Sequence, residues 1–208
     1  MNDTCPQCGQ WRVDKAIDPA GPYAICPECG HRQRFRQLPL LVVTGASGTG
    51  KSTVCSRLMG TIEEVVLLDG DILWLPEYAP PEEGHHRFYE TWLRVAKHIS
   101  QGGRPVVLYG AGLGVPENLE NCAQRRYLGP IHRLALTCDP GELEARLRAR
   151  PQWRNSDDPS YIEAHVAFNQ WFLDNANRFD PPIELLDTTD IPIKETVKRV
   201  TVWIRSKL

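Results

Sequence analysis

Short apolar runs alternate with helical patterns along most of the chain. Five runs have the length and composition of strands buried on both faces of a sheet: 40–44, 64–68, 105–109, 131–137 and 183–186. The segments between and after them are periodic in a way that is typical of helices: 51–59, 88–99, 141–150, 159–177 and 193–205. Strands separated by helices predict an α/β fold, in which helices sandwich a parallel five-stranded sheet.

Two of these helices carry clear signals of their own. Asp158 is placed to cap a helix whose first position is taken by Pro159. The last helix has one apolar face, formed by Val197, Val200, Thr201 and Ile204. We therefore expect a long helix near 159–177 and an amphipathic helix that closes the chain.

The first 37 residues differ from the rest in being rich in Cys, Pro, Gly and Gln. They contain two similar knuckles, Cys5-Pro6-Gln7-Cys8-Gly9 and Cys26-Pro27-Glu28-Cys29-Gly30. Four thiolates of Cys5, Cys8, Cys26 and Cys29 around one ion predict a structural zinc site, because no coordination position remains for a substrate. We predict a zinc ribbon at 1–37 and a second domain at 38–208. Redox chemistry and an iron site are the alternatives.

Composition and charge bear on the kind of partner and on the location of the protein. The chain has 208 residues, of which 24% are charged, and its formal net charge is -2, so a polyanion-binding surface is not indicated. Nucleic acid could contact the ribbon through 31–36, although a solvated connector explains that basic stretch as well. The start of the chain lacks a signal-peptide pattern, and no apolar run is long enough to span a membrane. We expect a cytoplasmic protein.

A complete P-loop, or Walker A motif, stands between the first strand and the first helix of the second domain: Gly45-Ala46-Ser47-Gly48-Thr49-Gly50-Lys51-Ser52. Its glycines let backbone N–H groups turn toward the phosphates of a nucleotide. Lys51 is expected at the β and γ phosphates and the Ser52 hydroxyl at Mg²⁺. Thr53 follows, with helix packing as the alternative to a phosphate contact.

Acidic residues follow the second strand rather than the third. Asp69 and Asp71 come after 64–68, whereas 105–109 is followed by a glycine-rich turn without a carboxylate. One carboxylate at that edge of the sheet can accept a proton from a substrate hydroxyl and the other can organise magnesium. Asp71 is the expected base and Asp69 a substrate ligand. The alternative is that both only cap the following turn.

From residue 38 to 208 the sequence resembles the small P-loop kinases, which include nucleoside, nucleotide, gluconate and shikimate kinases. The resemblance rests on the P-loop, Leu68-Asp69-Gly70-Asp71, Gly110-Ala111-Gly112-Leu113-Gly114, an arginine-bearing helix before Pro151, and Leu186-Asp187-Thr188-Thr189. Around residues 148–154, the sequence is similar to proteins labelled nucleoside kinases or broad-specificity nucleotide kinases. The resemblance implies a nucleotide-kinase-like fold, Asp71 as base or substrate ligand, and Gly110, Gly112 and Gly114 as a substrate-facing surface.

Arginines near 141–157 predict a lid over the nucleotide. Arg146 and Arg150 lie four residues apart and share a helix face. We expect Arg150 and Arg154 at the phosphates, where positive charge assists phosphoryl transfer, and Arg146 near the nucleotide. The alternative is a solvated helix face that pairs with Glu142 and Glu144.

The acceptor side is less defined. The segment 74–94 occupies the position of a substrate-binding insertion, in which Arg87 could hold a phosphate and Trp74 or Tyr78 could stack on a base. Arg125-Arg126 is a second candidate for an anion site. Packing or surface exposure is the alternative for each of these residues.

These features predict an ATP- and magnesium-dependent kinase that phosphorylates a small molecule, with a nucleoside or nucleoside monophosphate as the preferred acceptor. An antibiotic or another metabolite alcohol is an alternative acceptor. A protein of a different class, a zinc-ribbon regulator that senses nucleotide and binds a protein or RNA, is the second hypothesis. The sequence leaves the oligomeric state open.

Overall fold

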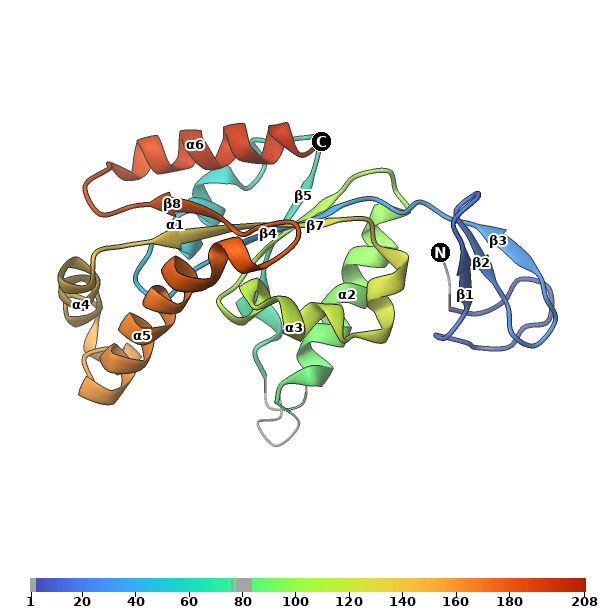
Figure 1. Ribbon diagram of the computed structural model, residues 1–208, viewed down its shortest axis with the longest axis horizontal. Helices are drawn as coiled ribbons and strands as arrows, with labels where there is room; N and C mark the ends of the chain where they lie inside the picture. Colours follow the sequence, from blue (N-terminus) through green and yellow to red (C-terminus); the bar gives the residue numbers. More distant parts are fainter. Residues whose placement is uncertain (1–2, 76, 78–83) are drawn as a thin grey trace.

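Five parallel strands form the central sheet of the computed structural model, which describes residues 3–75, 77 and 84–208 (Figure 1). The strand order is β5-β6-β4-β7-β8. Their bounds are β4 (Leu40–Thr44), β5 (Val66–Asp69), β6 (Val106–Tyr109), β7 (Ile131–Thr137) and β8 (Glu184–Asp187). The predicted α/β class with a parallel five-stranded sheet is confirmed.

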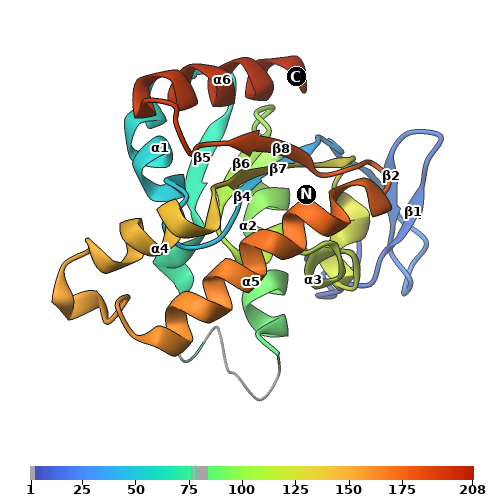
Figure 2. The ribbon, with the colours of Figure 1, turned by 60° about the vertical axis from the view of Figure 1, so that its left-hand side comes forward.

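Helices cover both faces of this sheet. On one face lie α1 (Lys51–Leu58) and α6 (Ile193–Ser206), and on the other α2 (His86–Ser100), α3 (Pro116–Glu120) and α5 (Pro159–Asn175) (Figures 1 and 2). The short α4 (Pro140–Arg148) precedes α5 at one end of the sheet. None of the helices within the described residues is long and apolar enough to cross a membrane.

The central strand β4 explains why both faces must be apolar. Leu40 and Val42 belong to the core under α2 and α3, whereas Leu41 and Val43 belong to the core under α1 and α6. All four side chains are completely buried. Successive strand residues point to opposite faces, so a strand covered on both sides needs an unbroken apolar run.

Most predicted elements are present, with shifted ends. β5 begins two residues later than predicted and includes Asp69, because Asp69 pairs with Tyr109 of β6. The predicted cap of α5 is confirmed, since Asp158 accepts hydrogen bonds from the backbone N–H groups of Ser160 and Tyr161. The short helix α3 and the strands within the first 37 residues were not predicted from the sequence.

Those strands form a small antiparallel sheet between and beside the two cysteine knuckles. They are β1 (Ala16–Asp18), β2 (Tyr23–Ile25) and β3 (Arg32–Arg34), in the order β1-β2-β3. At three residues each, they are too short to show a hydrophobic period in the sequence. We call residues 3–37 the N-terminal module.

The N-terminal module packs on the larger domain through a buried ion pair. Lys97 of α2 is completely buried, and its ammonium group donates to the carboxylate of Asp3. The same ammonium lies 4.8 Å from the centre of the Tyr127 ring, a cation–π contact. Tyr127 also donates from its hydroxyl to the Val13 carbonyl at 2.7 Å and meets the Phe35 ring edge-on.

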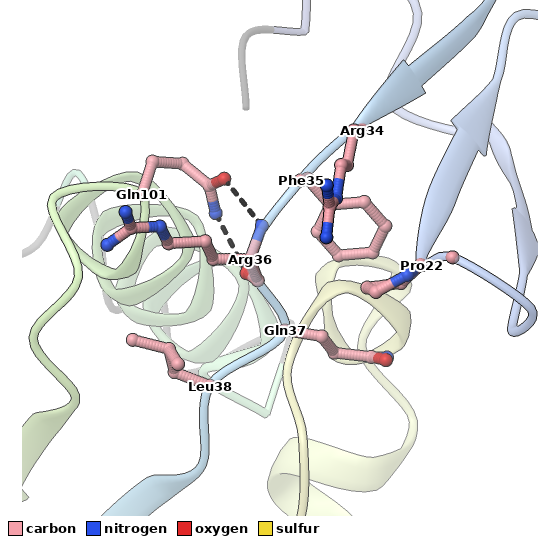
Figure 3. A pocket seen from close by; sticks show the side chains of 8 residues that line it. Pro22, Arg34, Phe35, Arg36, Gln37, Leu38 and Gln101 are labelled. Atoms are coloured by element: carbon pink, nitrogen blue, oxygen red, sulfur yellow. Dashed lines mark hydrogen bonds between the residues drawn. The ribbon is translucent and has the colours of Figure 1, made fainter.

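The connector between the two parts is also fixed. The Gln101 side chain at the end of α2 accepts from the backbone N–H of Arg36 at 2.9 Å and donates to the Arg36 carbonyl at 3.0 Å (Figure 3). A cavity of about 700 Å³ opens beside this contact, lined by Pro22, Arg34, Phe35 and neighbouring residues. The N-terminal module is therefore bound to the last turn of α2 through both its first residues, at Asp3, and its last residues, at Arg36.

The ion pair predicts the effect of a substitution at Lys97. Lys97→Ala would remove the closest partner of the buried Asp3 carboxylate and leave it only the longer contact with Arg94 at 3.8 Å, and we expect unfolding to become easier by about 3 kcal/mol. Lys198→Ala, on the exposed side of α6, is the matched control. Urea unfolding checks this, and equal unfolding free energies for the two variants would contradict it.

Candidate functional site

The loop from Gly45 to Gly50 joins β4 to α1 through backbone angles that favour glycine. The φ values of Gly45, Gly48 and Gly50 are 132°, 95° and 100°. A Cβ atom on Gly45 would lie 2.2 Å from the Leu136 carbonyl oxygen, and one on Gly48 would lie 2.8 Å from Leu143. Conformation thus favours glycine at all three positions, and close packing adds to this at Gly45 and Gly48.

Lys51 folds back across this loop. Its Nζ donates to the carbonyl of Ala46 at 2.9 Å. Burial lowers the pKa of Lys51 to about 8, and Arg150 acts in the same direction, while Asp71 opposes the shift. Ser52 lies in the first turn of α1, directly after Lys51. An anion at the loop would favour the charged form of Lys51.

The two acidic residues have different surroundings. Asp69 caps the turn that follows β5, since its carboxylate accepts from the backbone N–H of Asp71 at 3.1 Å. Partial burial and the nearby Asp69 carboxylate raise the pKa of Asp71, while the positive charges of Lys51 and Arg154 lower it. A carboxylate with a raised pKa accepts a proton more readily, which suits Asp71 to general-base chemistry.

The acidic turn is held from below by α2. Trp92 donates from its indole N–H to the carbonyl of Gly70 at 3.2 Å, and Gly70 stands between the two acids. A Cβ atom on Gly70 would lie 2.7 Å from the Tyr109 carbonyl oxygen. The position of the carboxylates therefore depends on α2 and on β6.

The arginines expected to form a lid have separate partners. Arg150 donates to the Ser47 hydroxyl at 3.0 Å, so it reaches the phosphate loop directly. Arg148 pairs with Glu144 at 2.8 Å on the helix surface. Arg154 lies 5.0 Å from the centre of the exposed Trp153 ring.

Arg146 is anchored beside a cavity next to the loop. It donates to the carbonyls of Thr188 and Thr189 at 2.8 and 2.9 Å and pairs with Glu142. The cavity has a volume of about 250 Å³ and is lined by Gly48, Thr49, Gly50, Thr53, Arg146, Thr188, Ile191, Ile193 and Thr196. An arginine and two isoleucines beside the phosphate loop can enclose the base of a nucleotide.

Two residues of α5 that the sequence analysis missed also contact the loop. The backbone N–H of Ser47 donates to His165 Nδ1 at 3.2 Å, and the Tyr161 hydroxyl lies 2.9 Å from Ser47 Oγ. Burial, with Lys51 and Arg150, lowers the pKa of His165 to about 4. Only their spacing on one helix face links the two residues in the sequence, and nothing there connects them to the P-loop.

The glycine-rich turn after β6 is closely packed. A Cβ atom on Gly112 would lie 2.6 Å from the Tyr89 hydroxyl. Asn118 of α3 donates to that hydroxyl at 3.0 Å and to the Gly112 carbonyl at 2.8 Å. Gly110 and Gly114 are buried, so among the three glycines only Gly112 keeps a partly exposed backbone.

The segment 74–94 is described in part. Trp74 packs edge-on against Phe88, with ring centres 5.1 Å apart, while remaining half exposed. Arg87 donates to the carbonyl of Glu77 at 3.3 Å. Tyr78 lies outside the described residues. The contacts of Trp74 and Arg87 agree with the packing alternative.

Arg125 and Arg126 have structural partners. Arg125 pairs with Glu120 at 2.7 Å and donates to the carbonyls of Leu128 and Gly129. Arg126 donates to a carbonyl one turn earlier. The contacts of Arg125 close the turn before β7 and agree with the packing alternative, while Arg126 lies exposed on the surface.

The four cysteines of the knuckles come together at one point. Sulfur atoms of Cys5 and Cys29 are 3.7 Å apart, those of Cys8 and Cys26 are 3.8 Å apart, and all four lie within 4.8 Å of one another. Four thiolates at about 2.3 Å from a tetrahedral ion are separated by about 3.8 Å. The cluster is therefore compatible with a zinc ribbon.

A second group, His86, Glu90 and Cys122, also lies within 4.8 Å. Glu90 already accepts hydrogen bonds from the backbone N–H groups of Ala123 and Gln124, at 2.5 and 3.2 Å. Its carboxylate caps the turn at 123–127, which accounts for its position without a metal.

The comparisons with known proteins concern the fold. No family model and no curated protein sequence matches the chain. A sugar kinase from Janibacter sp. HTCC2649 is 15% identical, with a TM-score of 0.57 over 82% of this chain and 95% of its own. A shikimate kinase from Bacteroides thetaiotaomicron is 18% identical, with a TM-score of 0.53 over 81% of this chain and 98% of its own. A gluconokinase from Sinorhizobium meliloti 1021 is also 18% identical, with a TM-score of 0.50 over 82% of this chain and 99% of its own. The chain shares its fold with these proteins.

The close packing of Gly48 predicts the effect of adding one methyl group. Gly48→Ala should strain the backbone and also displace Leu143 of α4, at a combined cost of about 2–4 kcal/mol. Gly60→Ala is the matched control, since Gly60 also has a positive φ of 74°, but among the described residues, its chain neighbours aside, none has an atom within 4 Å of the added carbon. Chemical denaturation of both variants tests this. Equal losses would show that packing against α4 adds nothing.

Proposed function

We propose that the chain is a kinase that transfers the γ phosphate of ATP to a small molecule. The observation that carries the proposal is the meeting of a P-loop, a lysine, an arginine and a carboxylate at one edge of the sheet. Lys51 lies within electrostatic reach of Asp71, and Arg150 contacts Ser47 of the loop. The kinases that share the fold support the same class of reaction.

The nucleotide would bind along the phosphate loop. Backbone N–H groups of the loop, Lys51 and Thr53 would hold the phosphates, and the Ser52 hydroxyl would hold Mg²⁺. When bound, the metal neutralises charge on the transferred group. Arg146 would face the nucleotide across the cavity beside the loop. Arg150 and Arg154 would supply positive charge at the phosphates.

Asp71 would act as the general base. The acceptor oxygen forms the new bond to the γ phosphorus, the bond from that phosphorus to ADP breaks, and the acceptor's proton passes to Asp71. A hydroxyl needs such a base, whereas a phosphate acceptor does not. If Asp71 acts as this base, the acceptor is a nucleoside or another alcohol; with a nucleoside monophosphate, Asp71 would instead serve magnesium or the sugar hydroxyls. Asp69, Arg87, Gly110 and Gly112 remain candidates for the acceptor side.

We also propose that the four cysteines bind structural zinc. Their sulfur spacing fits a tetrahedral thiolate site, and the three short strands beside them supply little core of their own. The ion would then provide much of the folding free energy of the N-terminal module. The module would serve α2 by holding Asp3 against Lys97.

The role of Asp71 predicts a large loss of turnover on substitution. Asp71→Asn keeps the size of the side chain but removes the base, and kcat for acceptor-dependent ADP release should fall about 100- to 10,000-fold. Asp174→Asn, on the exposed surface of α5, is the control. The assay pools nucleosides, nucleotides and other alcohols with ATP and magnesium.

Two results would contradict the proposal in different ways. Unchanged turnover in Asp71→Asn would remove the general base but leave the kinase. Tight ATP binding without turnover for any acceptor, together with specific RNA or protein capture, would favour a nucleotide-sensing regulator instead.

The metal proposal predicts about one zinc per chain in freshly purified protein. Removal of the ion by a chelator should lower the thermal unfolding midpoint, because the N-terminal module would lose its fold and expose Lys97. Elemental analysis and a thermal scan test both points, with added zinc as the reversal. Protein that contains iron or little metal, or that is unaffected by chelation, would refute the zinc assignment.

A further inference from the structure

Ser47, at the tip of the phosphate loop, is held by three side chains at once. Arg150 and Tyr161 bind its hydroxyl, and His165 accepts its backbone N–H. Arg150 was expected near the loop, whereas the contact with His165 was not. We propose that His165 Nδ1 occupies the acceptor position that a phosphate oxygen takes when ATP binds, so that His165 competes with the nucleotide for Ser47. This inference rests on the nucleotide-binding part of the proposed function.

Contacts within α5 hold His165 in place. The Asp158 cap fixes the first turn of α5 by accepting from the Tyr161 N–H at 3.2 Å. Tyr161 and His165 lie four residues apart and so share a helix face, and their ring centres are 4.3 Å apart. Tyr161 in turn contacts the Ser47 hydroxyl. The imidazole is thus held at the loop by its own helix and by Tyr161.

The chemistry of the contact is that of a neutral acceptor. Nδ1 can accept from Ser47 only if the ring proton is on Nε2 and the imidazole is uncharged. The charged and titratable groups that face it, Lys51 and Arg150, together with burial, lower the pKa of His165 and keep the ring neutral. The ring therefore supplies an electron pair at a place where two cations also converge.

A phosphate oxygen is the stronger acceptor for the same groups. Hydrogen bonds to an anion are roughly twice as strong as those between neutral groups. The Ser47 N–H has one proton to donate, and Arg150 is bound to a neutral hydroxyl. On nucleotide binding both donors would exchange a neutral partner for an anionic one. Part of the affinity for ATP would be lost in breaking the contact with His165.

Removing the acceptor should therefore tighten ATP binding. In His165→Phe the ring remains beside Tyr161 but cannot accept from Ser47, and we expect the Kd for ATP to fall about 3- to 10-fold. His165→Asn places an amide oxygen near the position of Nδ1 and is expected to restore the wild-type Kd. Adenosine, which has no phosphate, should bind all three proteins equally. Isothermal titration calorimetry measures these constants.

A merely structural role for His165 would weaken binding or leave it unchanged, so either result in His165→Phe overturns the inference. Equal tightening in His165→Asn, or tighter adenosine binding, would also overturn it, because the effect would not follow the acceptor or the phosphates. If the wild-type protein binds ATP in the same titrations, these outcomes leave the proposed function standing. Failure of the wild-type protein to bind ATP would remove both.

Discussion

The backbone can reverse between β4 and α1 only where side chains are absent. Gly45 lies against a carbonyl of β7, and Gly48 lies against Leu143 of α4. The loop is therefore packed directly on β7 and α4. This constraint brings α4 and α5 over the loop and places Arg150 and His165 at Ser47. The glycines thus position the surrounding charged groups as well as the loop's own N–H groups.

Helix α2 connects the two parts of the chain. At one point it binds the turn between the two acids, through Trp92 and the Gly70 carbonyl. Farther along, the completely buried Lys97 needs the carboxylate of Asp3, which lies just before the first cysteine knuckle. A buried ammonium is costly without a partner, so the N-terminal module is part of the environment that α2 requires. This gives a physical reason for a small cysteine-rich module beside a sheet of this kind.

The features that could be predicted from the sequence are those set by residues close together in the chain. The strands, the Asp158 cap and the P-loop were predicted from period and motif. Arg150 was expected near the loop as part of a helix over 141–150, but α4 ends at Arg148, so Arg150 reaches Ser47 from the segment after the helix. The end of β5 at Asp69 was misplaced because pairing with Tyr109 sets it. His165 and Lys97 were missed because their partners, Ser47 and Asp3, are distant in the sequence, and nothing in the sequence indicates which residues will meet across a fold.

The charges at the loop argue for an anionic ligand independently of any motif. Lys51 and Arg150 donate to the neutral oxygens of Ala46 and Ser47, and burial lowers the pKa of both cations. The carboxylate of Asp69 is engaged by the turn that it caps. Asp71 partly offsets the positive charge of Lys51, but the hydrogen bonds of both cations go to neutral oxygens, and a partly desolvated cation is held less favourably there than in water. A phosphate group would bring negative charge to both cations, so the cost of placing them together becomes a preference for a polyanion.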